Sequence, residues 1–381
     1  MTRKQDLHPL SVLHVLTLNT RNGEYGGPVR VARETCTELK LMGHDVKIFS
    51  GTLKNLEPDV ILDLNESFVR VSPIWSKYPI SSLWSWNLIP ELYRKIRDSD
   101  IVHIHFARDL VSLFAAMICL FQRKRFVTQT HGMVVYDSRY LTKVLDRIFI
   151  VPLLCRSSVN FVLNEFERNR IAQVSNRFNL KILANGISTS NYYKSNRTRN
   201  HLVVAFCSRL HPQKRVDKFL ELATSQKNND IEFQIFGTDG GDLWKVKNYL
   251  NLTNRNHRVS YLGHLPPSEV IRTISEIDVL ILPSFNENFP MIILEALSVG
   301  TCVLVMPSCG ISKTLTVFNS DFVSEDESTD GLVKTFERLK NQVHDIKRDS
   351  IIHFCLNNFS IKKVCEDLAC IYYEILEYHG R

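Results

Sequence analysis

Charged and titratable side chains follow several apolar runs of this 381-residue chain, at the point where each run ends. His131 comes directly after RFVTQT, beside Gly132, and could hydrogen-bond a substrate or move a proton. Arg209 directly follows HLVVAFCS, and Lys214 stands near the start of the next helical pattern. Two cations that meet at a helix N-terminus make a clamp for a diphosphate. A surface histidine and a solvated basic loop are the alternatives.

Two carboxylates occur in the segment that follows the apolar run DVLILP. Glu287 lies in the loop after this predicted strand, Pro290 begins a helix, and Glu295 lies within the apolar run 291 to 297. A carboxylate on a largely buried helix is costly unless it is paired or hydrogen-bonded. Ligand hydroxyl groups would satisfy Glu295, and so would a structural partner.

Adjacent glycines follow the first apolar run, where Gly26-Gly27-Pro28 is predicted to open a helix. Glycines let the backbone approach a ligand closely, and a helix N-terminus attracts anions. The pattern is not G-x-G-x-x-G, so a dinucleotide site is poorly supported. The loop is either a ligand contact or only a turn.

Two further patterns could in principle hold a metal. His103 and His105 share one face of a predicted strand, but no third ligand is evident, so core or cleft-edge histidines are favoured. The D-x-D run 98 to 100 precedes a strand and so lies at the end of the sheet where ligands do not bind. We therefore expect no metal site and no cofactor.

Short β-branched runs alternate with helical patterns in both halves, which predicts two doubly wound parallel sheets in series. The polar stretch 191 to 200 has the composition of a linker. We expect an N-terminal domain over 1–190, joined by a C-terminal helix at 361–381, and a second domain over 191–360. Ligands bind such sheets beyond the carboxyl ends of the strands, so the loops named above should face a common cleft.

The composition excludes a disordered or fibrous chain, with 44% apolar and 23% charged residues. The net charge is +7, and the first 184 residues carry all of the excess, which suggests an anionic partner or only a solvated basic surface. Nine cysteines without a C-x-x-C pair predict free thiols in a reducing compartment. No signal peptide or membrane-spanning run is evident, so we expect a cytoplasmic protein.

The motifs together carry a family likeness. The chain resembles retaining nucleotide-sugar glycosyltransferases of the GT-B fold, family 4 (glycosyl transferases group 1), along nearly its whole length. Each matching piece is weak alone, but their order and spacing make the match specific: Gly26-Gly27, DIVHIH, Thr130-His131-Gly132, Asn185-Gly186-Ile187, Ser208 to Lys214, and the E-x7-E pair Glu287 and Glu295. The resemblance implies two facing Rossmann-like domains, with a C-terminal helix crossing back to the first.

The resemblance also implies roles for these residues. Arg209 and Lys214 would hold the donor diphosphate, Glu295 would bind the ribose, and Glu287 and His131 would contact the transferred sugar as the catalytic pair. The remaining donor contacts would be the loop Gly26 and Gly27, the backbone of Asn288, Phe289, Pro290 and Met291, and, near the nucleotide base, Gly263 and His264. Three positions depart from the family pattern: Ser208 and Asn288 replace frequent glycines, and Lys313 replaces a common glutamate. These changes could shift donor preference or alter activity.

Aromatic and basic residues mark a possible acceptor surface. Trp75, Tyr78, Trp84 and Trp86 lie close together in sequence, and the segment 136 to 156 mixes four cations with apolar residues. Such a mixture suits a membrane headgroup layer or a lipid-linked acceptor, whereas core aromatics and a solvated helix are the alternative. No recognition motif for nucleic acid accompanies the positive charge.

The sequence thus predicts a metal-independent, retaining glycosyltransferase of hexosyl type. It would use a UDP- or GDP-sugar and a glycan or lipid-linked acceptor in polysaccharide or glycolipid assembly, at the inner face of a membrane. A nucleotide-sugar 2-epimerase is the first alternative, but it should need additional carboxylates for proton removal. A non-catalytic partner subunit that binds sugar nucleotides is the second, and the retention of all four charged donor contacts argues against it.

Overall fold

The structure is a computed structural model that describes residues 8–19, 26–53, 64–77, 80–188, 201–226, 230–252 and 258–377. The chain divides into two compact units, and each is described here by itself. Unit 1 comprises Met1–Gly186 and Ile361–Arg381, and unit 2 comprises Ile187–Ser360. The predicted domain boundary at 190 falls outside the described residues.

Unit 1 is built on an eight-stranded sheet in the order β4-β3-β2-β1-β5-β6-β7-β8. All neighbours are parallel except β3 and β4. The strand order changes direction at β1, because β2, β3 and β4 lie on one side of it and β5 to β8 on the other. His14 of β1 is in register with His103 of β5. The strands are β1 (Ser11–Leu18), β2 (Asp45–Leu53), β3 (Asn65–Pro73), β4 (Leu83–Trp84), β5 (Ile101–His105), β6 (Arg125–Gln129), β7 (Asn160–Val162) and β8 (Leu180–Ile182).

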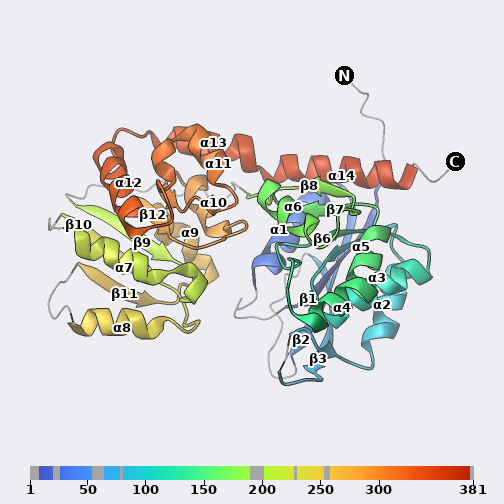
Figure 1. Ribbon diagram of the computed structural model, residues 1–381. Coiled ribbons are helices and arrows are strands. Elements are labelled where there is room, and N and C mark those ends of the chain that lie inside the picture. The colour runs from blue at the N-terminus through green and yellow to red at the C-terminus, as the bar shows by residue number, and fades with distance from the viewer. Residues whose placement is uncertain are drawn as a thin grey trace. The chain divides into compact units, whose positions relative to one another are not determined.

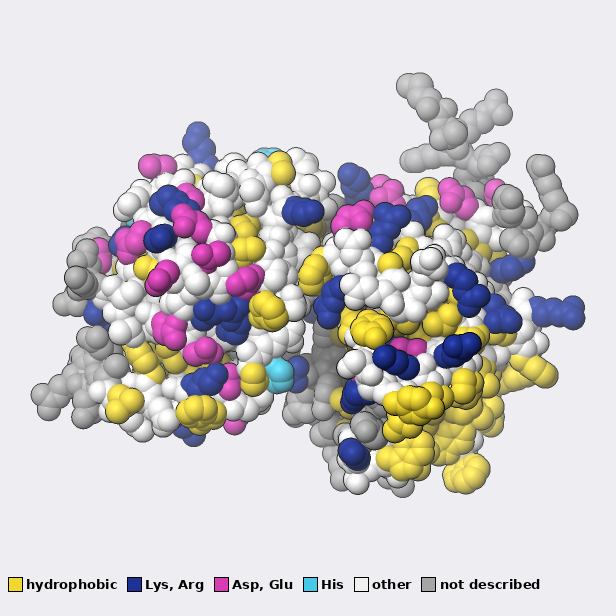
Figure 2. All heavy atoms as spheres, viewed as in Figure 1, with side chains coloured by type: hydrophobic (Ala, Val, Ile, Leu, Met, Phe, Trp, Pro, Cys, Tyr) yellow, Lys and Arg dark blue, Asp and Glu magenta, His cyan; other side chains and the backbone are white. Residues whose placement is uncertain are grey.

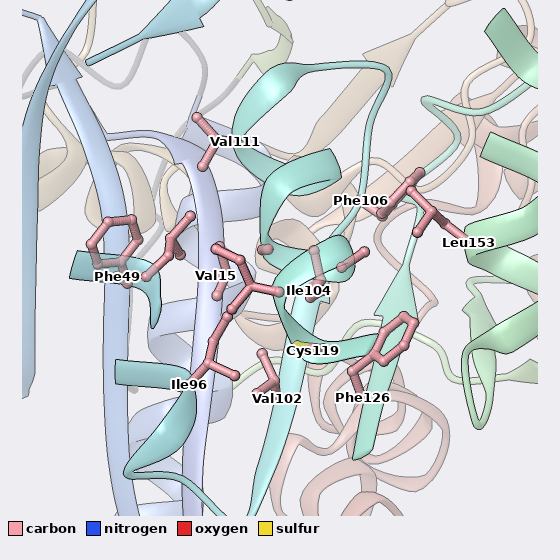
Figure 3. Close-up of a cluster of buried hydrophobic side chains, with 14 of the residues drawn as sticks. Val15, Phe49, Ile96, Val102, Ile104, Phe106, Val111, Cys119, Phe126 and Leu153 are labelled. Carbon is pink, nitrogen blue, oxygen red and sulfur yellow. The ribbon is translucent and has the colours of Figure 1, made fainter. Parts of the chain in front are cut away.

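Helices cover both faces of this sheet, and every residue of β5 is accordingly buried. Helices α2 (Leu88–Arg97), α3 (Leu110–Phe121) and α5 (Val151–Arg156) pack on one face through a core that includes Val15, Ile104 and Phe126 (Figure 3). Asp109 caps α3 by accepting a hydrogen bond from the Ser112 N–H at 3.0 Å. The unit also contains α4 (Tyr140–Leu145), the π-helical segment η1 (Asp146–Ile150), which runs directly into α5, and α6 (Glu165–Ala172).

The opposite face is covered by α1 (Gly26–Leu41) and α14 (Ile361–Glu377), the long red helix of Figure 1. Cys365, Leu368 and Tyr372 of α14 are buried in one core with Val12 and Cys36. The predicted C-terminal helix that returns to the first domain is therefore confirmed. Removing this helix would expose the apolar side chains of α1 and of the sheet that pack against it.

Unit 2 is a five-stranded parallel sheet in the order β11-β10-β9-β12-β13. Its strands are β9 (Leu202–Cys207), β10 (Ile231–Phe236), β11 (Val259–Gly263), β12 (Val279–Leu282) and β13 (Cys302–Val305). Its helical segments are η2 (Pro212–Lys214), α7 (Val216–Ser225), α8 (Leu243–Leu252), α9 (Pro267–Ser275), α10 (Met291–Ser298), α11 (Ser312–Phe318), η3 (Ser320–Phe322), α12 (Thr329–Gln342) and α13 (Arg348–Phe359). The predicted doubly wound architecture of both units is confirmed.

Two composition-based expectations concern thiols and membrane spans. All nine cysteines lie among the described residues, where they form no disulfide and seven of them are buried. Within the described ranges, no helix combines the length and the apolar character needed to cross a bilayer.

Candidate functional site

The loops that follow β9, β10 and β12 lie side by side at one edge of the unit 2 sheet, because β9 pairs with both of its neighbours. The Ser208 N–H donates to the Phe236 carbonyl at 3.1 Å, and the Gly237 N–H donates to the Gly263 carbonyl at 2.8 Å. A Cβ at Gly237 would lie 1.9 Å from the Ser208 oxygen, and its φ is +152°. Only glycine fits there, so the backbones after β9 and β10 meet closely.

Lys214 and Glu287 are brought together at this edge, although 73 residues separate them. The Lys214 ammonium forms an ion pair with the Glu287 carboxylate, and the two side chains are only 20% and 15% exposed. The loops are also joined by the backbone, since the Phe285 N–H donates to the Gln213 carbonyl at 2.9 Å. The predicted diphosphate cation and the predicted catalytic carboxylate therefore occupy one site.

The start of the helix that follows Lys214 differs from the prediction. A short 3-10 turn ends at Lys214, Arg215 adopts a left-handed conformation with φ +53°, and α7 begins at Val216 rather than at about residue 214. His211 stabilises the turn by accepting a hydrogen bond from the Gln213 N–H at 3.2 Å. The left-handed residue separates the turn from the helix and holds Lys214 on the loop.

Arg215 has a structural partner that sequence reasoning missed. Its guanidinium contacts Glu327 twice, through a carboxylate oxygen at 2.8 Å and through the carbonyl at 2.7 Å. The other Glu327 oxygen accepts from the Ser308 N–H at 2.8 Å. Glu327 thereby ties the loop after β9 to the loop after β13. Neither residue stood in a recognisable motif, because their separation of 112 residues hides the pairing.

Arg209 is exposed on the same loop, directly after β9. A Cβ at Gly240 would lie 2.8 Å from the Arg209 Cγ atom, so this glycine leaves room for the arginine stem. Gly263 has φ +78° at the end of β11, and His264 beside it is exposed. These residues all lie at the carboxyl end of the sheet, where the sequence placed them.

The segment after Glu287 leads into α10. Phe289 is buried and its ring lies 6.0 Å from that of Phe359, so this side chain belongs to the core. Pro290 precedes the first helical residue, Met291, and Asn288 is half-buried. Glu295 is only 1% exposed on α10, which confirms the expected burial of this carboxylate. Of the departures from the family pattern, Ser208 is half-buried and Lys313 is exposed in the first turn of α11.

In unit 1, His131 lies two residues after the end of β6 and adopts a left-handed backbone conformation with φ +49°. The loop around it is held by Glu167, which is 1% exposed on α6. Glu167 accepts hydrogen bonds from the Thr130 hydroxyl at 2.6 Å, from the Gly132 N–H and from the Leu163 N–H at 2.7 Å. Sequence reasoning missed Glu167, whose first-turn position on a helix resembles that of any capping carboxylate.

His131 belongs to a chain of stacked imidazoles. His105 Nδ1 lies 2.7 Å from His131 Nε2, and His105 Nε2 lies 3.1 Å from His14 Nδ1. The ring of His103 stacks on those of His14 and His105, and its Nδ1 lies 2.6 Å from the Tyr372 hydroxyl of α14. The predicted sharing of a face by His103 and His105 is confirmed, and two more histidines join them.

These imidazoles are uncharged at neutral pH. Burial lowers the pKa of His14 and of His131 to about 3, and it lowers the pKa of His103 and of His105 well below the usual value. Within the described ranges, no group of three or more histidines, cysteines or carboxylates is arranged to hold a metal. His131 is therefore suited to give or accept a hydrogen bond rather than to carry a positive charge.

The two remaining predicted features of unit 1 are the glycine loop and the D-x-D run. Gly26 begins α1 and Gly27 is exposed, as expected for a helix opening, whereas residues 20 to 25 before them lie outside the described ranges. The D-x-D run lies between the end of α2 at Arg97 and the start of β5 at Ile101, at the amino end of that strand. The glycine loop therefore remains a candidate contact.

Comparison with known families accounts for this arrangement. Residues 190–352 match the family described as Glycosyl transferases group 1, and residues 25–191 match Glycosyltransferase Family 4. The chain belongs to glycosyltransferase family 4. The two matches divide this GT-B glycosyltransferase at about residue 190.

Individual relatives are more distant. The glycosyltransferase is 31% identical over 109 residues to D-inositol 3-phosphate glycosyltransferase of Corynebacterium diphtheriae, a match that covers 27% of this chain and 26% of that relative's length. A solved glycosyltransferase from Rickettsia africae is similar in fold, with a TM-score of 0.75, 17% identity and coverage of 97% of this chain and 99% of that one. Anabaena Alr3699/HepE, solved in complex with UDP and glucose, gives a TM-score of 0.74 at 14% identity, covering 94% and 98%.

Proposed function

We propose that this glycosyltransferase moves a hexose from a UDP- or GDP-sugar to a glycan or lipid-linked acceptor, with retention of anomeric configuration and without a metal. The acceptor would belong to polysaccharide or glycolipid assembly at the inner face of a membrane. The observation that carries the proposal is the ion pair of Lys214 and Glu287 at the carboxyl edge of the unit 2 sheet, on the loop that also bears Arg209.

The cations suit the leaving group of this reaction. Sugar transfer from a nucleotide diphosphate builds negative charge on the diphosphate, and preorganised positive groups lower the barrier to that charge separation. Arg209 and Lys214 supply two such groups. The N-terminus of α10, at Met291, supplies backbone N–H groups on the neighbouring loop. In this proposal the diphosphate takes over the Lys214 ammonium from Glu287.

The carboxylates and His131 then act on the sugar and the nucleoside. Glu287, once its ammonium partner has moved to the phosphate, accepts hydrogen bonds from hydroxyls of the transferred sugar. Glu295 accepts from the ribose, and backbone groups of the loop before α10 hold the donor. His131 contributes a neutral hydrogen bond, which agrees with its pKa of about 3. In this proposal the donor phosphate itself takes the acceptor proton, which gives front-face retention.

The choice of donor has one support from the comparisons. Anabaena Alr3699/HepE, which shares the fold, was solved with UDP and glucose bound, and another of its structures holds UDP-glucose. UDP-sugars are therefore the first donors to test. The positions Asn288 and Lys313, which depart from the family pattern, would tune the choice of sugar rather than remove binding.

A donor screen tests the proposal. Purified protein is heated with UDP-, GDP- and ADP-sugars, with and without EDTA, and slow release of the nucleotide is followed in parallel. We expect one nucleotide class to raise the unfolding midpoint, with Arg209→Ala and Lys214→Ala losing the shift. Lys247→Ala is the matched control, because Lys247 is an exposed cation on α8 and not on the loops after β9 or β12.

The outcomes separate the parts of the proposal. If no sugar nucleotide binds, the transferase function is rejected and a non-catalytic partner subunit takes its place. If binding needs a divalent cation, only the metal-independent part of the proposal is rejected, and the transferase function stands. The anomeric configuration of the product, read by NMR, decides between retention and inversion.

A further inference from the structure

Arg215 has a backbone conformation that arginine rarely adopts. Its φ of +53° and ψ of +49° lie in the left-handed region, where Cβ crowds the carbonyl oxygen that follows. Glycine and asparagine tolerate this region best. Arg215 lies between Lys214 and Val216, the first residue of α7, so its backbone sets how the loop that bears Lys214 leads into the helix. Such strain persists where the surrounding structure holds the residue in place.

The side chain of Arg215 is held by Glu327. One guanidinium nitrogen donates to the Glu327 carboxylate at 2.8 Å, and another donates to the Glu327 carbonyl at 2.7 Å. The second carboxylate oxygen accepts from the Ser308 N–H at 2.8 Å, and the Ser308 hydroxyl accepts from the Asn286 N–H at 3.0 Å. Glu327 and Ser308 therefore link Arg215 to the residue that directly precedes Glu287.

These residues come from segments that are not neighbours in the unit 2 sheet. Arg215 follows β9, and β12 lies between β9 and β13. Glu327 belongs to a segment that pairs with the far side of β13, because Val323 forms a parallel bridge with Val305. The Arg215 side chain reaches across the end of β12, and its guanidinium lies 5.6 Å from the centre of the Phe285 ring on the loop after that strand.

Arg215 is more buried than an ordinary surface cation. On the face of unit 2 that Figure 2 shows, Lys and Arg side chains are intermixed with Asp and Glu side chains. Arg338, which pairs with Asp321 and Glu325, is 47% exposed, whereas the Arg215 side chain is only 18% exposed. Water and salt screen a partly buried ion pair less than an exposed one. We therefore expect Arg215 to hold a fixed geometry.

We propose that a clamp holds the Glu287 loop in place when the sugar donor binds, an inference that rests on the proposed function. This Arg215 clamp consists of Arg215, Glu327 and Ser308. In the structure the Lys214 ammonium is paired with Glu287, and a diphosphate that takes over this ammonium removes that link between the loops after β9 and β12. The Arg215 clamp persists, because none of its residues is a proposed donor contact. Arg215 and Glu327 are thus positioning residues, which keep the site preorganised.

Amide hydrogen exchange tests the Arg215 clamp in the full chain without a ligand. The Phe285 and Asn286 N–H groups both form hydrogen bonds, so their exchange reports how often the loop opens. Arg215→Asn removes the guanidinium but suits the left-handed backbone, and Glu327→Ala removes its acceptor and leaves Arg215 unchanged. We expect each variant to stay folded by circular dichroism and to exchange these amides about fivefold faster, the value of one ion pair. Wild-type exchange rates in both variants overturn the proposal.

Nucleotide binding separates a clamp from a direct phosphate contact. Calorimetric titration with UDP and GDP should show about tenfold weaker binding for Arg215→Asn and for Glu327→Ala. The double variant should be no weaker than either single one, because both changes remove the same unit. If Arg215 itself bound the phosphates, Glu327→Ala would free its guanidinium and bind more tightly. Tighter binding by Glu327→Ala, or losses that add up in the double variant, would contradict the Arg215 clamp.

Arg338→Ala is the matched control, because it removes ion pairs from the segment 321 to 325, close in sequence to Glu327. It should keep the wild-type exchange rates at Phe285 and Asn286 and the wild-type nucleotide affinity. An effect as large as that of Arg215→Asn would show that the loss is not specific to the Arg215 clamp and would reject it. Wild type that binds no nucleotide rejects the proposed function, and the exchange rates then still decide whether the clamp exists.

Discussion

The Nδ1 atom of His105 lies 2.7 Å from the Nε2 atom of His131, so the outermost imidazole of the buried chain is fixed through one of its two ring nitrogens. Within the described ranges, no hydrogen bond engages the other nitrogen, Nδ1. Both rings are uncharged, because burial lowers both pKa values. If His131 contacts the sugar donor, it does so through Nδ1, and His105 is the positioning residue that sets its tautomer.

Two substitutions of His131 distinguish its nitrogens. Asparagine places a polar atom close to the Nδ1 position, whereas glutamine places one close to Nε2. We expect His131→Asn to retain more activity than His131→Gln, which should lose about tenfold in kcat/KM, the value of one hydrogen bond. Steady-state kinetics with the identified donor measure this difference. Full activity of His131→Gln would reject a contact through Nδ1.

Glu287→Gln should tighten the binding of the free nucleotide but slow the turnover of the intact donor. In the structure, the Lys214 ammonium is paired with Glu287, and a diphosphate must compete with that carboxylate. Removing the negative charge should tighten the binding of UDP or GDP a few-fold, because about 1 kcal/mol of ion pairing no longer opposes it. The same change should lower kcat with the intact donor. Calorimetric titration with the nucleotide checks the first effect, and weaker nucleotide binding by the variant would contradict it.

The sequence predicts what depends on neighbours in the chain and misses what depends on distant pairs. The C-terminal helix was predicted to begin at residue 361, where α14 begins, and Glu287 was placed correctly in the loop after a strand. The pairing of Lys214 with Glu287 spans 73 residues, and that of His103 with Tyr372 spans 269. Such contacts arise from sheet order and helix packing, which local periodicity does not encode.

Aromatic residues show the same limit. The sequence grouped four of them as one possible surface, but Trp86 is 86% exposed whereas Trp84 is half-buried against the core. Trp75 is exposed, and Tyr78 lies outside the described residues. β4 spans only Leu83–Trp84 and Trp86 lies beyond it, so the strand is too short for its alternation to be recognised in the sequence.

Acidification should destabilise unit 1 before unit 2. His14 is fully buried with a pKa of about 3, against 6.5 when unfolded, so the unfolded chain binds more protons between these values and stability falls as pH falls below 6.5. This group alone should cost about 1.4 kcal/mol at pH 5.5. The other three histidines act in the same direction. Asp109, whose pKa is raised to about 6 by burial, opposes them by about 0.8 kcal/mol at that pH.

Tryptophan fluorescence can isolate this effect. Three of the four tryptophans belong to unit 1, and Trp244→Phe removes the one in unit 2. Urea unfolding of that variant should become easier between pH 7 and pH 5.5, and an added His14→Gln should reduce the pH dependence by one group. His353→Gln, at an exposed position of α13, should not change it. A pH-independent unfolding midpoint would show that the histidines are not buried uncharged.

Loss of the Glu167 carboxylate should loosen the loop that carries His131. Glu167→Ala leaves the donors of Thr130, Gly132 and Leu163 without their acceptor, and we expect the free energy of unfolding of unit 1 to fall by about 3 kcal/mol. Glu165→Ala is the matched control on the same helix turn. Glu165 is exposed and its ion pair with Arg168 should contribute less than about 0.5 kcal/mol. Equal effects of the two substitutions, measured by urea unfolding, would remove Glu167 from this role.

The position of α14 has a consequence for synthesis on the ribosome. Unit 2 contains all of its own strands and helices before Ser360, so its core can close while the chain is still being made. Unit 1 starts earlier but cannot cover Val12, Cys36 and their neighbours until residues 361 to 377 have left the exit tunnel. The first unit to be translated is thus the last to be completed, and in the interval its open face is the part of the nascent chain that most needs a chaperone.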